Sequence, residues 1–373
     1  MQTTSLLTDD GWSSLLRRLP QDIDLDGLAR RTKALRRRRG VPDAATLLRL
    51  ALMVGPGGLS LRAAASWAGI RGIATLTDPS LNDRLHGAND FLKAIVGCLL
   101  AKRVMGTSRR WPGRCLRLAD GSSLTEPGGI GTDWRLHAVL DLERGGFSHL
   151  DLTDGHGGEA LDRGAAVPGE IRLADRNYGQ AKALHRFITS VGATPGADYV
   201  VRLRWSSLRL RREDGRAFTL IGHLKSLPAD QAISEVTVLI DGGPAGAAPL
   251  RARVIVMRKP PEATEAERKR LRHTAHRLQK KLDDRSLIAA EYMMLATSLP
   301  ADQFPAAQVM EMYRFRWQIE LAFKRLKSIL HLDRLPCTTE QGSKTWIYAH
   351  LILALLLDDL TQDFLESSPS APA

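Results

Sequence analysis

Apolar and polar positions repeat with two different periods along this chain, and the change of period divides it into regions. Residues 1 to about 105 repeat apolar side chains at helical spacing, with Gly and Pro breaks around residues 54–58. One helix is expected over residues 59–69, with Ser60 as its N-cap. The beginning of the chain therefore predicts a helical region.

From about residue 110 the apolar residues alternate, a pattern typical of strands. Residues 134–142 and 147–153 predict a hairpin with a turn at 143–146, next to a strand that reaches residue 120. Further strands are expected over residues 199–205, 218–221, 236–240 and 251–257. Helices are expected over residues 159–163, 181–191, 262–284 and 346–357, and disorder after residue 364.

Two short apolar runs end in the same three residues, Leu-Ala-Asp, at Asp120 and at Asp175. Gly121 follows the first and Arg-Asn-Tyr-Gly follows the second, so both carboxylates are expected where a strand gives way to a turn. Aspartate is common in turns, and either copy alone would indicate no more than a turn. Two copies of the motif favour a shared chemical role for the two carboxylates.

A helix predicted over residues 313–327 presents four functional side chains on one face and apolar side chains on another. At about 100° per residue the four lie within roughly 60° of one another. They are Tyr313, Arg316, Glu320 and Lys327. A surface helix held by ion pairs would show the same pattern, so this segment alone leaves both interpretations open.

Asp120, Asp175 and Glu320 together offer the hard oxygen ligands that Mg²⁺ or Mn²⁺ prefer. Two such ions activate a water or a 3′-hydroxyl and stabilise the leaving oxygen of a phosphodiester, without a protein nucleophile. Arg316 and Lys327, about 6 Å and about 10 Å along the helix from Glu320, are spaced to hold phosphates.

These residues resemble the DDE transposases of bacterial insertion sequences, in particular the subgroup marked by Tyr-x2-Arg-x3-Glu-x6-Lys. Leu-Ala-Asp-Gly-Ser-Ser and Ala-Asp-Arg-Asn-Tyr-Gly are similar to the family's two aspartate strands, and the similarity covers roughly residues 100–360. The resemblance implies an α/β fold with an RNase H-like catalytic core. A β-rich insertion would interrupt this core, and a helical N-terminal domain would precede it.

The same resemblance implies Mg²⁺- or Mn²⁺-dependent cleavage at the ends of the element, with two ions, and transfer of the 3′-ends to target DNA. The DNA partners would be terminal inverted repeats and target DNA, and a homodimer is expected because two ends must be paired. Tyr313 would contact the DNA end, by stacking on a base or binding a phosphate. Trp205 would hold a flipped base if cleavage passes through a hairpin.

The expected division of the chain has five parts. They are a helical, DNA-binding domain (1–105), the first part of the catalytic core (106–195), the β-rich insertion with its basic helix (196–290), the second part of the core (291–363) and a disordered tail (364–373).

Charge agrees with a polyanionic partner. The net charge is +12 and the isoelectric point about 9.9, which favours DNA binding, although an arginine-rich proteome would give the same balance. The basic run Arg36, Arg37, Arg38 and Arg39 is expected to contact phosphates. Residues 59–86 also suit a helix-turn-helix whose second helix presents Asn82 and Arg84 to a groove.

Other classes of site and location have little support in the sequence. The longest apolar run is too short to span a bilayer, and no signal peptide is visible at the N-terminus, so a cytoplasmic, nucleoid-associated protein is expected. Three cysteines without paired spacing predict neither disulfides nor zinc. Two alternatives remain open: a non-enzymatic DNA-binding regulator derived from a transposase, and a structure-specific RNase H-like nuclease.

Overall fold

A computed structural model describes most of the chain. The described residues are 8–101, 111–129, 131–192, 195–228, 230–317, 319–320, 323–324 and 335–367. The helices are α1 Asp9–Leu16, α2 Leu25–Arg31, α3 Ala44–Val54, α4 Leu61–Ile70, α5 Asp78–His86, α6 Asn89–Ala101, α7 Ala181–Thr189, α8 Leu220–Ser226, α9 Pro261–Arg277, α10 Asp284–Ala289, α11 Ala306–Tyr313, the 3₁₀ turn η2 Arg314–Arg316 and α13 Glu340–Ser367.

The strands form one mixed sheet in the order β3-β2-β1-β4-β5-β10-β9-β8-β6-β7. Their bounds are β1 Cys115–Leu124, β2 Trp134–Asp141, β3 Gly146–Asp154, β4 Glu170–Ala174, β5 Asp198–Arg202, β6 Arg209–Arg211, β7 Ala217–Phe218, β8 Ile233–Asp241, β9 Leu250–Arg258 and β10 Tyr292–Thr297. The pairs β1–β4 and β4–β5 are parallel, and the other pairs are antiparallel.

Alternate residues of the central strands enter two different cores, as the period of a strand requires. Leu118 and Leu136 belong to a core shared with α6, α13 and the N-terminal helices. Ala119 and Val139 belong to a second core, which α7 covers with Leu184. Both faces of this half of the sheet are therefore buried, which explains why its strands are so apolar.

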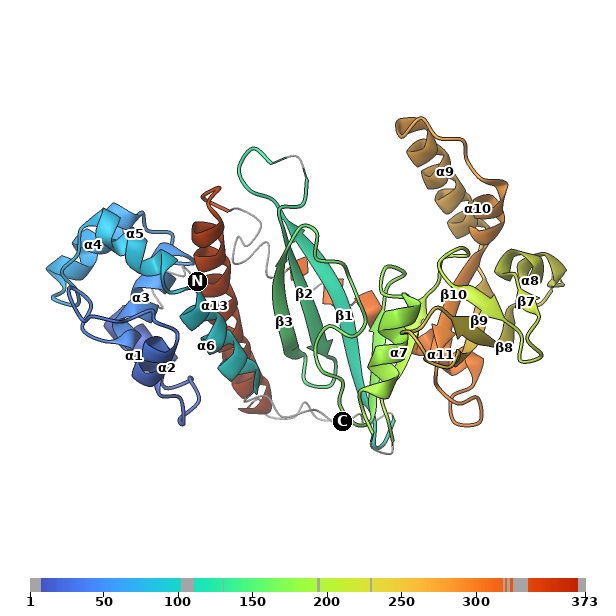
Figure 1. The fold of residues 1–373 in the computed structure, drawn as a ribbon, viewed down its shortest axis with the longest axis horizontal. Coiled ribbons are helices and arrows are strands. Elements are labelled where there is room, and N and C mark those ends of the chain that lie inside the picture. Colours follow the sequence, from blue (N-terminus) through green and yellow to red (C-terminus); the bar gives the residue numbers. More distant parts are fainter. Residues whose placement is uncertain are drawn as a thin grey trace.

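The N-terminal helices lie at one end of the molecule, and the strand-rich block, β6 to β9 with the loop that precedes β6, lies at the other (Figure 1). Between the N-terminal helices and the sheet, α6 and α13 lie side by side, and α6 also contacts β3. The apolar segment predicted as a closing helix is thus the buried part of α13, which contacts α3, α5 and α6. At the far end α9 projects beyond the sheet (Figure 1).

Several local predictions are confirmed. The hairpin forms as β2 and β3, and α7 and α4 occupy the segments predicted as helices. The side chain of Ser60 accepts a hydrogen bond from the backbone N–H of Ala63 at 3.2 Å, so Ser60 caps α4. These features depend on local sequence, which makes them accessible to pattern analysis.

Other local predictions are wrong. The strand expected over residues 218–221 ends at Phe218 and gives way to α8. The charged helix expected to reach residue 284 ends at Arg277, and α13 continues to Ser367, beyond the predicted start of the tail. Residues 368–373 lie outside the described part.

The helix expected over residues 159–163 does not form, because another partner takes the backbone carbonyls of this loop. The guanidinium of Arg172, on β4, donates hydrogen bonds to the carbonyl oxygens of Leu161, Arg163, Gly164 and Ala165 at 2.8–3.3 Å. Arg172 is fully buried and also pairs with Glu170 at 2.6 Å. One side chain therefore holds the loop against the sheet.

No helix in the described part of the chain is both long and apolar enough to cross a membrane.

Replacing Arg172 with Met should strongly destabilise the protein. After the change, the buried carboxylate of Glu170 keeps only its contact to Arg117 at 3.4 Å and one backbone N–H. The loop carbonyl oxygens that Arg172 binds also lose their hydrogen-bond donor. Breaking a buried pair costs about 3–5 kcal/mol, which urea unfolding would measure. Arg272→Met, which breaks an exposed pair with Glu265, is the control and should change stability little. Equal losses in both variants would contradict this account.

Candidate active site

The register between β1 and β4 brings the two predicted aspartates together. These parallel strands pair Ala119 with Ala174, and the next residue in each strand direction is an aspartate. Asp175 follows the end of β4, as predicted. Because parallel strands run in the same direction, Asp120 and Asp175 lie side by side at the same edge of the sheet.

Asp120 does not end its strand, contrary to prediction. The sequence Ala-Asp-Gly continues as β1 up to Leu124, with Asp120 opposite Ala138 and Gly121 opposite His137 on β2. The pairing with β4 stops at Ala174, but β2 remains as a partner and keeps β1 extended. Asp120 therefore sits on a hydrogen-bonded strand, which is a more rigid support than a turn.

The carboxylate of Asp120 is largely buried, with a side chain 20% exposed. Burial raises its pKa to about 6, and the charges of Glu159 and Asp175 add to this effect. The backbone N–H of Gly121, which donates to Oδ1 at 2.9 Å, and the cation Arg316 act in the opposite direction. A buried carboxyl beside other carboxylates is a site that favours a proton or another cation.

Asp175 presents a buried oxygen that no donor satisfies. Its Oδ1 is inaccessible to solvent and has no hydrogen-bond partner. Leaving such an acceptor unsatisfied is costly, so the position suits a cation or a donor from a ligand.

The segment predicted as one continuous helix changes geometry in its middle. Helix α11 ends at Tyr313, a 3₁₀ turn covers Arg314–Arg316, and helical conformation resumes at Trp317. The helix face predicted to carry Tyr313, Arg316, Glu320 and Lys327 is therefore interrupted between Tyr313 and Arg316. Lys327, the last of the four predicted side chains, lies outside the described residues.

Tyr313 is turned toward the protein and is not available to DNA, which corrects the predicted contact. Its side chain is buried at 7% exposure, and its hydroxyl donates to the carbonyl oxygen of Ala174 at 3.3 Å. Burial raises the pKa of Tyr313, so the hydroxyl stays a donor. Tyr313 thus attaches α11 to β4 at the residue before Asp175.

Arg316 lies between two of the predicted carboxylates. Its guanidinium is 2.5 Å from Oε1 of Glu320 and 4.0 Å from Oδ2 of Asp120. The side chain of Glu320 is 55% exposed. Glu320 therefore approaches Asp120 only through Arg316 in this arrangement, and its carboxylate is directed to the guanidinium.

Among the described residues, no three His, Cys, Asp or Glu side chains lie close enough together to hold a metal ion. The structure brings together Asp120 and Asp175, with Arg316 beside Asp120, but it does not form the expected cage of three carboxylates. The arginine acts as a counter-ion to carboxylates that would otherwise repel one another.

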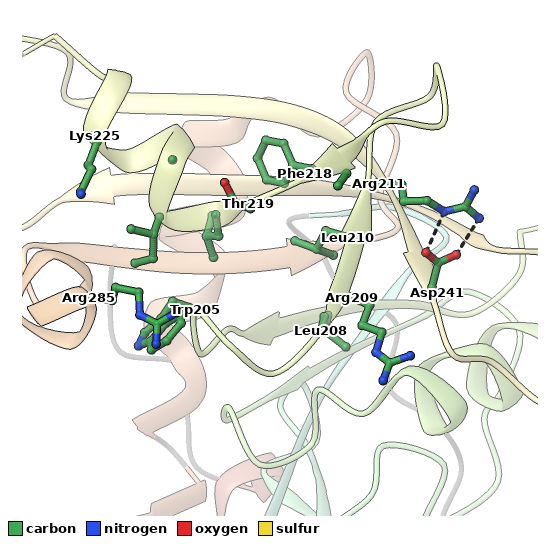
Figure 2. A pocket seen from close by; sticks show the side chains of 14 residues that line it. Trp205, Leu208, Arg209, Leu210, Arg211, Phe218, Thr219, Lys225, Asp241 and Arg285 are labelled. Atoms are coloured by element: carbon green, nitrogen blue, oxygen red, sulfur yellow. Dashed lines mark hydrogen bonds and ion pairs between the residues drawn. The ribbon is translucent and has the colours of Figure 1, made fainter. Parts of the chain in front are cut away.

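Trp205 lies in the strand-rich block, at a cavity of about 630 Å³ (Figure 2). Its indole N–H donates to Oγ of Ser286 at 3.3 Å, and the guanidinium of Arg285 stacks on its ring at 4.5 Å. The neighbouring Arg204 donates to Oδ1 of Asn177, two residues after Asp175, at 2.5 Å. The base contact expected of Trp205 stays a prediction.

The basic run Arg36–Arg39 is exposed, as a phosphate-binding segment would need to be. Arg38 pairs with Asp26 at 3.0 Å, and the backbone carbonyl of Arg39 accepts a hydrogen bond from Arg84 at 3.0 Å. The arginine expected to enter a groove is thus partly engaged within the protein.

From the sequence, Glu159 could cap the helix predicted over residues 159–163 or position a metal-bound water, and the cap is the favoured interpretation. The helix does not form, and the structure places the Glu159 carboxylate at Gly121, the residue after Asp120. Tyr178, three residues after Asp175 and part of the Ala-Asp-Arg-Asn-Tyr-Gly segment, reaches the same place, but the sequence pattern assigns it no role of its own. Their only sequence signals are a glycine after Asp120 and a carboxylate in a glycine-rich loop.

Comparisons with known proteins give the family. The model of the transposase DDE domain matches residues 111–357. The chain is 41% identical over 363 residues to the transposase for insertion sequence element IS421 of Escherichia coli, covering 96% of both chains. It is also 41% identical over 362 residues to InsL of insertion sequence element IS186A of Escherichia coli strain K12, again covering 96% of both chains.

A solved structure of the piggyBac transposase synaptic complex with hairpin DNA aligns with a TM-score of 0.45 and 8% identity, covering 99% of this chain and 76% of the other. The family assignment does not depend on this alignment. Proteins of this family generally use divalent metal ions to cut and join DNA. The chain belongs to the DDE transposases of insertion sequences and is an enzyme that acts on DNA.

Proposed function

We propose that this transposase cleaves DNA at the ends of its insertion sequence and joins the 3′-ends to target DNA by two-metal-ion chemistry. The observation that carries the proposal is the parallel register that sets Asp120 beside Asp175. Glu320 is the third proposed ligand, because its helix is attached to β4 through Tyr313 and its partner Arg316 already reaches toward Asp120.

The donor set suits Mg²⁺ or Mn²⁺, which prefer carboxylate oxygens. The unsatisfied Oδ1 of Asp175 and the raised pKa of Asp120 both indicate a place where a cation is favourable. For Glu320 to join them, it has to leave Arg316, and its exposed position leaves space for that movement. In this proposal, two divalent ions bind between Asp120, Asp175 and Glu320.

In the proposed mechanism Asp120, Asp175 and Glu320 would hold the ions, which would supply activation of a water or a 3′-hydroxyl and stabilisation of the leaving oxygen. Asp120 has to be ionised to hold an ion, so ion binding should weaken as the pH falls below its pKa of about 6. Arg316, once parted from Glu320, is free to bind a phosphate beside the scissile bond. Tyr313 does not touch the DNA but keeps the start of this helix fixed against β4.

The proposal extends to the rest of the molecule. Residues 106–195 and 291–363 would form the RNase H-like core, and residues 196–290 the insertion. Because β5 pairs in parallel with β4, this first strand of the predicted insertion would belong to the sheet of the core. Arg36, Arg37, Arg38, Arg39 and Lys327 would contact phosphates of the terminal inverted repeats or target DNA, and Trp205 a displaced base. A homodimer would pair the two ends, in the bacterial cytoplasm at the nucleoid.

Asp120→Asn and Glu320→Gln should each reduce cleavage and strand transfer about a thousand-fold or more, while DNA binding and fold persist. Both changes remove a metal-binding charge and keep the shape of the side chain. Cleavage and joining of labelled terminal-repeat DNA with Mg²⁺ would measure this, with DNA binding followed separately. Asp162→Asn, which changes a half-buried carboxylate paired with Arg186, is the matched control and should remain active. Full cleavage by either variant would refute the assignment.

The raised pKa of Asp120 gives a pH dependence with a definite sign. Because the folded value is about 6 and the ordinary value is 3.8, ionisation favours the unfolded chain between these values. Without metal, the wild type should lose stability relative to Asp120→Asn as the pH rises from about 4 to about 6. Thermal unfolding across this range would measure the difference, and parallel curves for the two proteins would contradict it.

Exposed arginines of the N-terminal region should contribute to the salt dependence of DNA binding. If Arg36 and Arg37 each neutralise one phosphate, replacing both by Ala should lower the slope of log affinity against log salt by about 2. Fluorescence anisotropy at several salt concentrations would give the slope. Arg38→Ala removes a single arginine that is already paired with Asp26, so it should lower the slope by about 1 at most. An unchanged slope in the double variant would exclude this contact.

A further inference from the structure

Because Gly121 has no side chain, a carboxylate and a hydroxyl approach β1 closely at the residue that follows Asp120. A Cβ at position 121 would lie 3.0 Å from Oε1 of Glu159 and 3.4 Å from the hydroxyl of Tyr178. The first distance is tighter than ordinary packing allows, so Glu159 occupies space that any larger residue at 121 would contest.

The backbone of Glu159 is held by the segments that carry the catalytic residues. Its carbonyl oxygen accepts a hydrogen bond from Nε2 of Gln180 at 2.7 Å. Gln180 belongs to the turn that follows Asp175, and its own N–H is bonded to the carbonyl of Tyr178. On the other side, Arg163 donates to the carbonyl of Gly158 at 2.7 Å. The position of Glu159 is therefore built into the fold.

The side chain of Glu159 is only 16% exposed, and its ion pair with Arg135 is loose at 3.7 Å. A carboxylate this buried needs more than one distant cation to offset its desolvation. The carboxylate is also placed at Gly121, the residue next to Asp120 on β1.

Tyr178 supplies an independent indication of a ligand. The residue is 2% exposed, yet its hydroxyl has no hydrogen-bond partner. Buried hydroxyls are normally bonded, and an unsatisfied one costs about 1–3 kcal/mol. The hydroxyl and the Glu159 carboxylate lie 3.4 Å and 3.0 Å from the same position, the Cβ site of Gly121, so both groups border this part of β1.

We propose that Glu159 is a fourth carboxylate of the catalytic centre, which, with the hydroxyl of Tyr178, binds the water shell of a divalent ion held by Asp120 and Asp175. This inference rests on the metal-binding function proposed above. Glu159 is thus a positioning residue, which acts on the ion through water, as partners outside the direct ligands of metal sites commonly do.

The test measures metal affinity directly, so that it does not depend on catalysis. Mn²⁺ is titrated into the full-length chain without DNA, and free Mn²⁺ is followed by electron paramagnetic resonance. Glu159→Gln should weaken binding about tenfold or more, and Tyr178→Phe by a smaller but measurable factor. Asp162→Asn, a carboxylate of the same loop paired with Arg186, is the matched control and should bind like the wild type.

Wild-type affinity in Glu159→Gln would overturn the inference. If circular dichroism shows that Glu159→Gln is not folded, Tyr178→Phe decides, because removing an unsatisfied hydroxyl should not impair folding; unchanged affinity would then overturn it. Asp120→Asn distinguishes failure of the proposed metal site from failure of the role given to Glu159. If that variant also keeps wild-type affinity, the proposed metal site itself is wrong. If it loses binding and Glu159→Gln does not, only the role of Glu159 fails.

Discussion

The catalytic half of this transposase depends on the parallel pairing of β1 with β4. The register that sets Ala119 against Ala174 puts Asp120 and Asp175 next to each other, although they come from distant parts of the chain. A shift of one residue would turn one of the carboxylates to the opposite face of the sheet. The buried leucines that flank both strands specify this register, so the core and the site are determined together.

Bringing carboxylates together has an electrostatic cost, which the structure meets with a guanidinium. Arg316 approaches Asp120 and binds Glu320, and the hydroxyl of Tyr313 holds the start of the same segment against β4. The 3₁₀ turn Arg314–Arg316 directly follows the attachment point and ends at the arginine of the ion pair. A short, tighter turn of this kind is a frequent feature where a helix has to redirect its side chains.

A second set of buried charges, Glu170 and Arg172 on β4, holds a loop beside the site. Glu170 and Arg172 are fully buried, pair with each other, and contact Arg117 and the loop carbonyls. Buried ion pairs contribute less to stability than their geometry suggests, because desolvation offsets the attraction. Their effect here is specific: they hold the loop that carries Glu159 in one position next to β1.

The sequence by itself determined the features that depend on neighbouring residues or on a short repeated pattern. The alternation of apolar residues placed β2, β3 and β4, Ser60 marked the start of α4, and Leu-Ala-Asp together with the Tyr-Arg-Glu-Lys spacing indicated the family. Each strand, cap or motif among these signals can be recognised in a segment of at most about fifteen residues, where local propensity and periodicity act.

Only the tertiary structure decided where the functional groups point. Asp120 stays on a strand because β2 continues beside it, Tyr313 is buried because β4 offers a carbonyl, and residues 161–165 remain a loop because Arg172 takes their carbonyls. Glu159 meets Gly121 for the same kind of reason. In every case the deciding partner is distant in sequence, and hydrogen bonding and burial between distant segments exist only once the chain has folded.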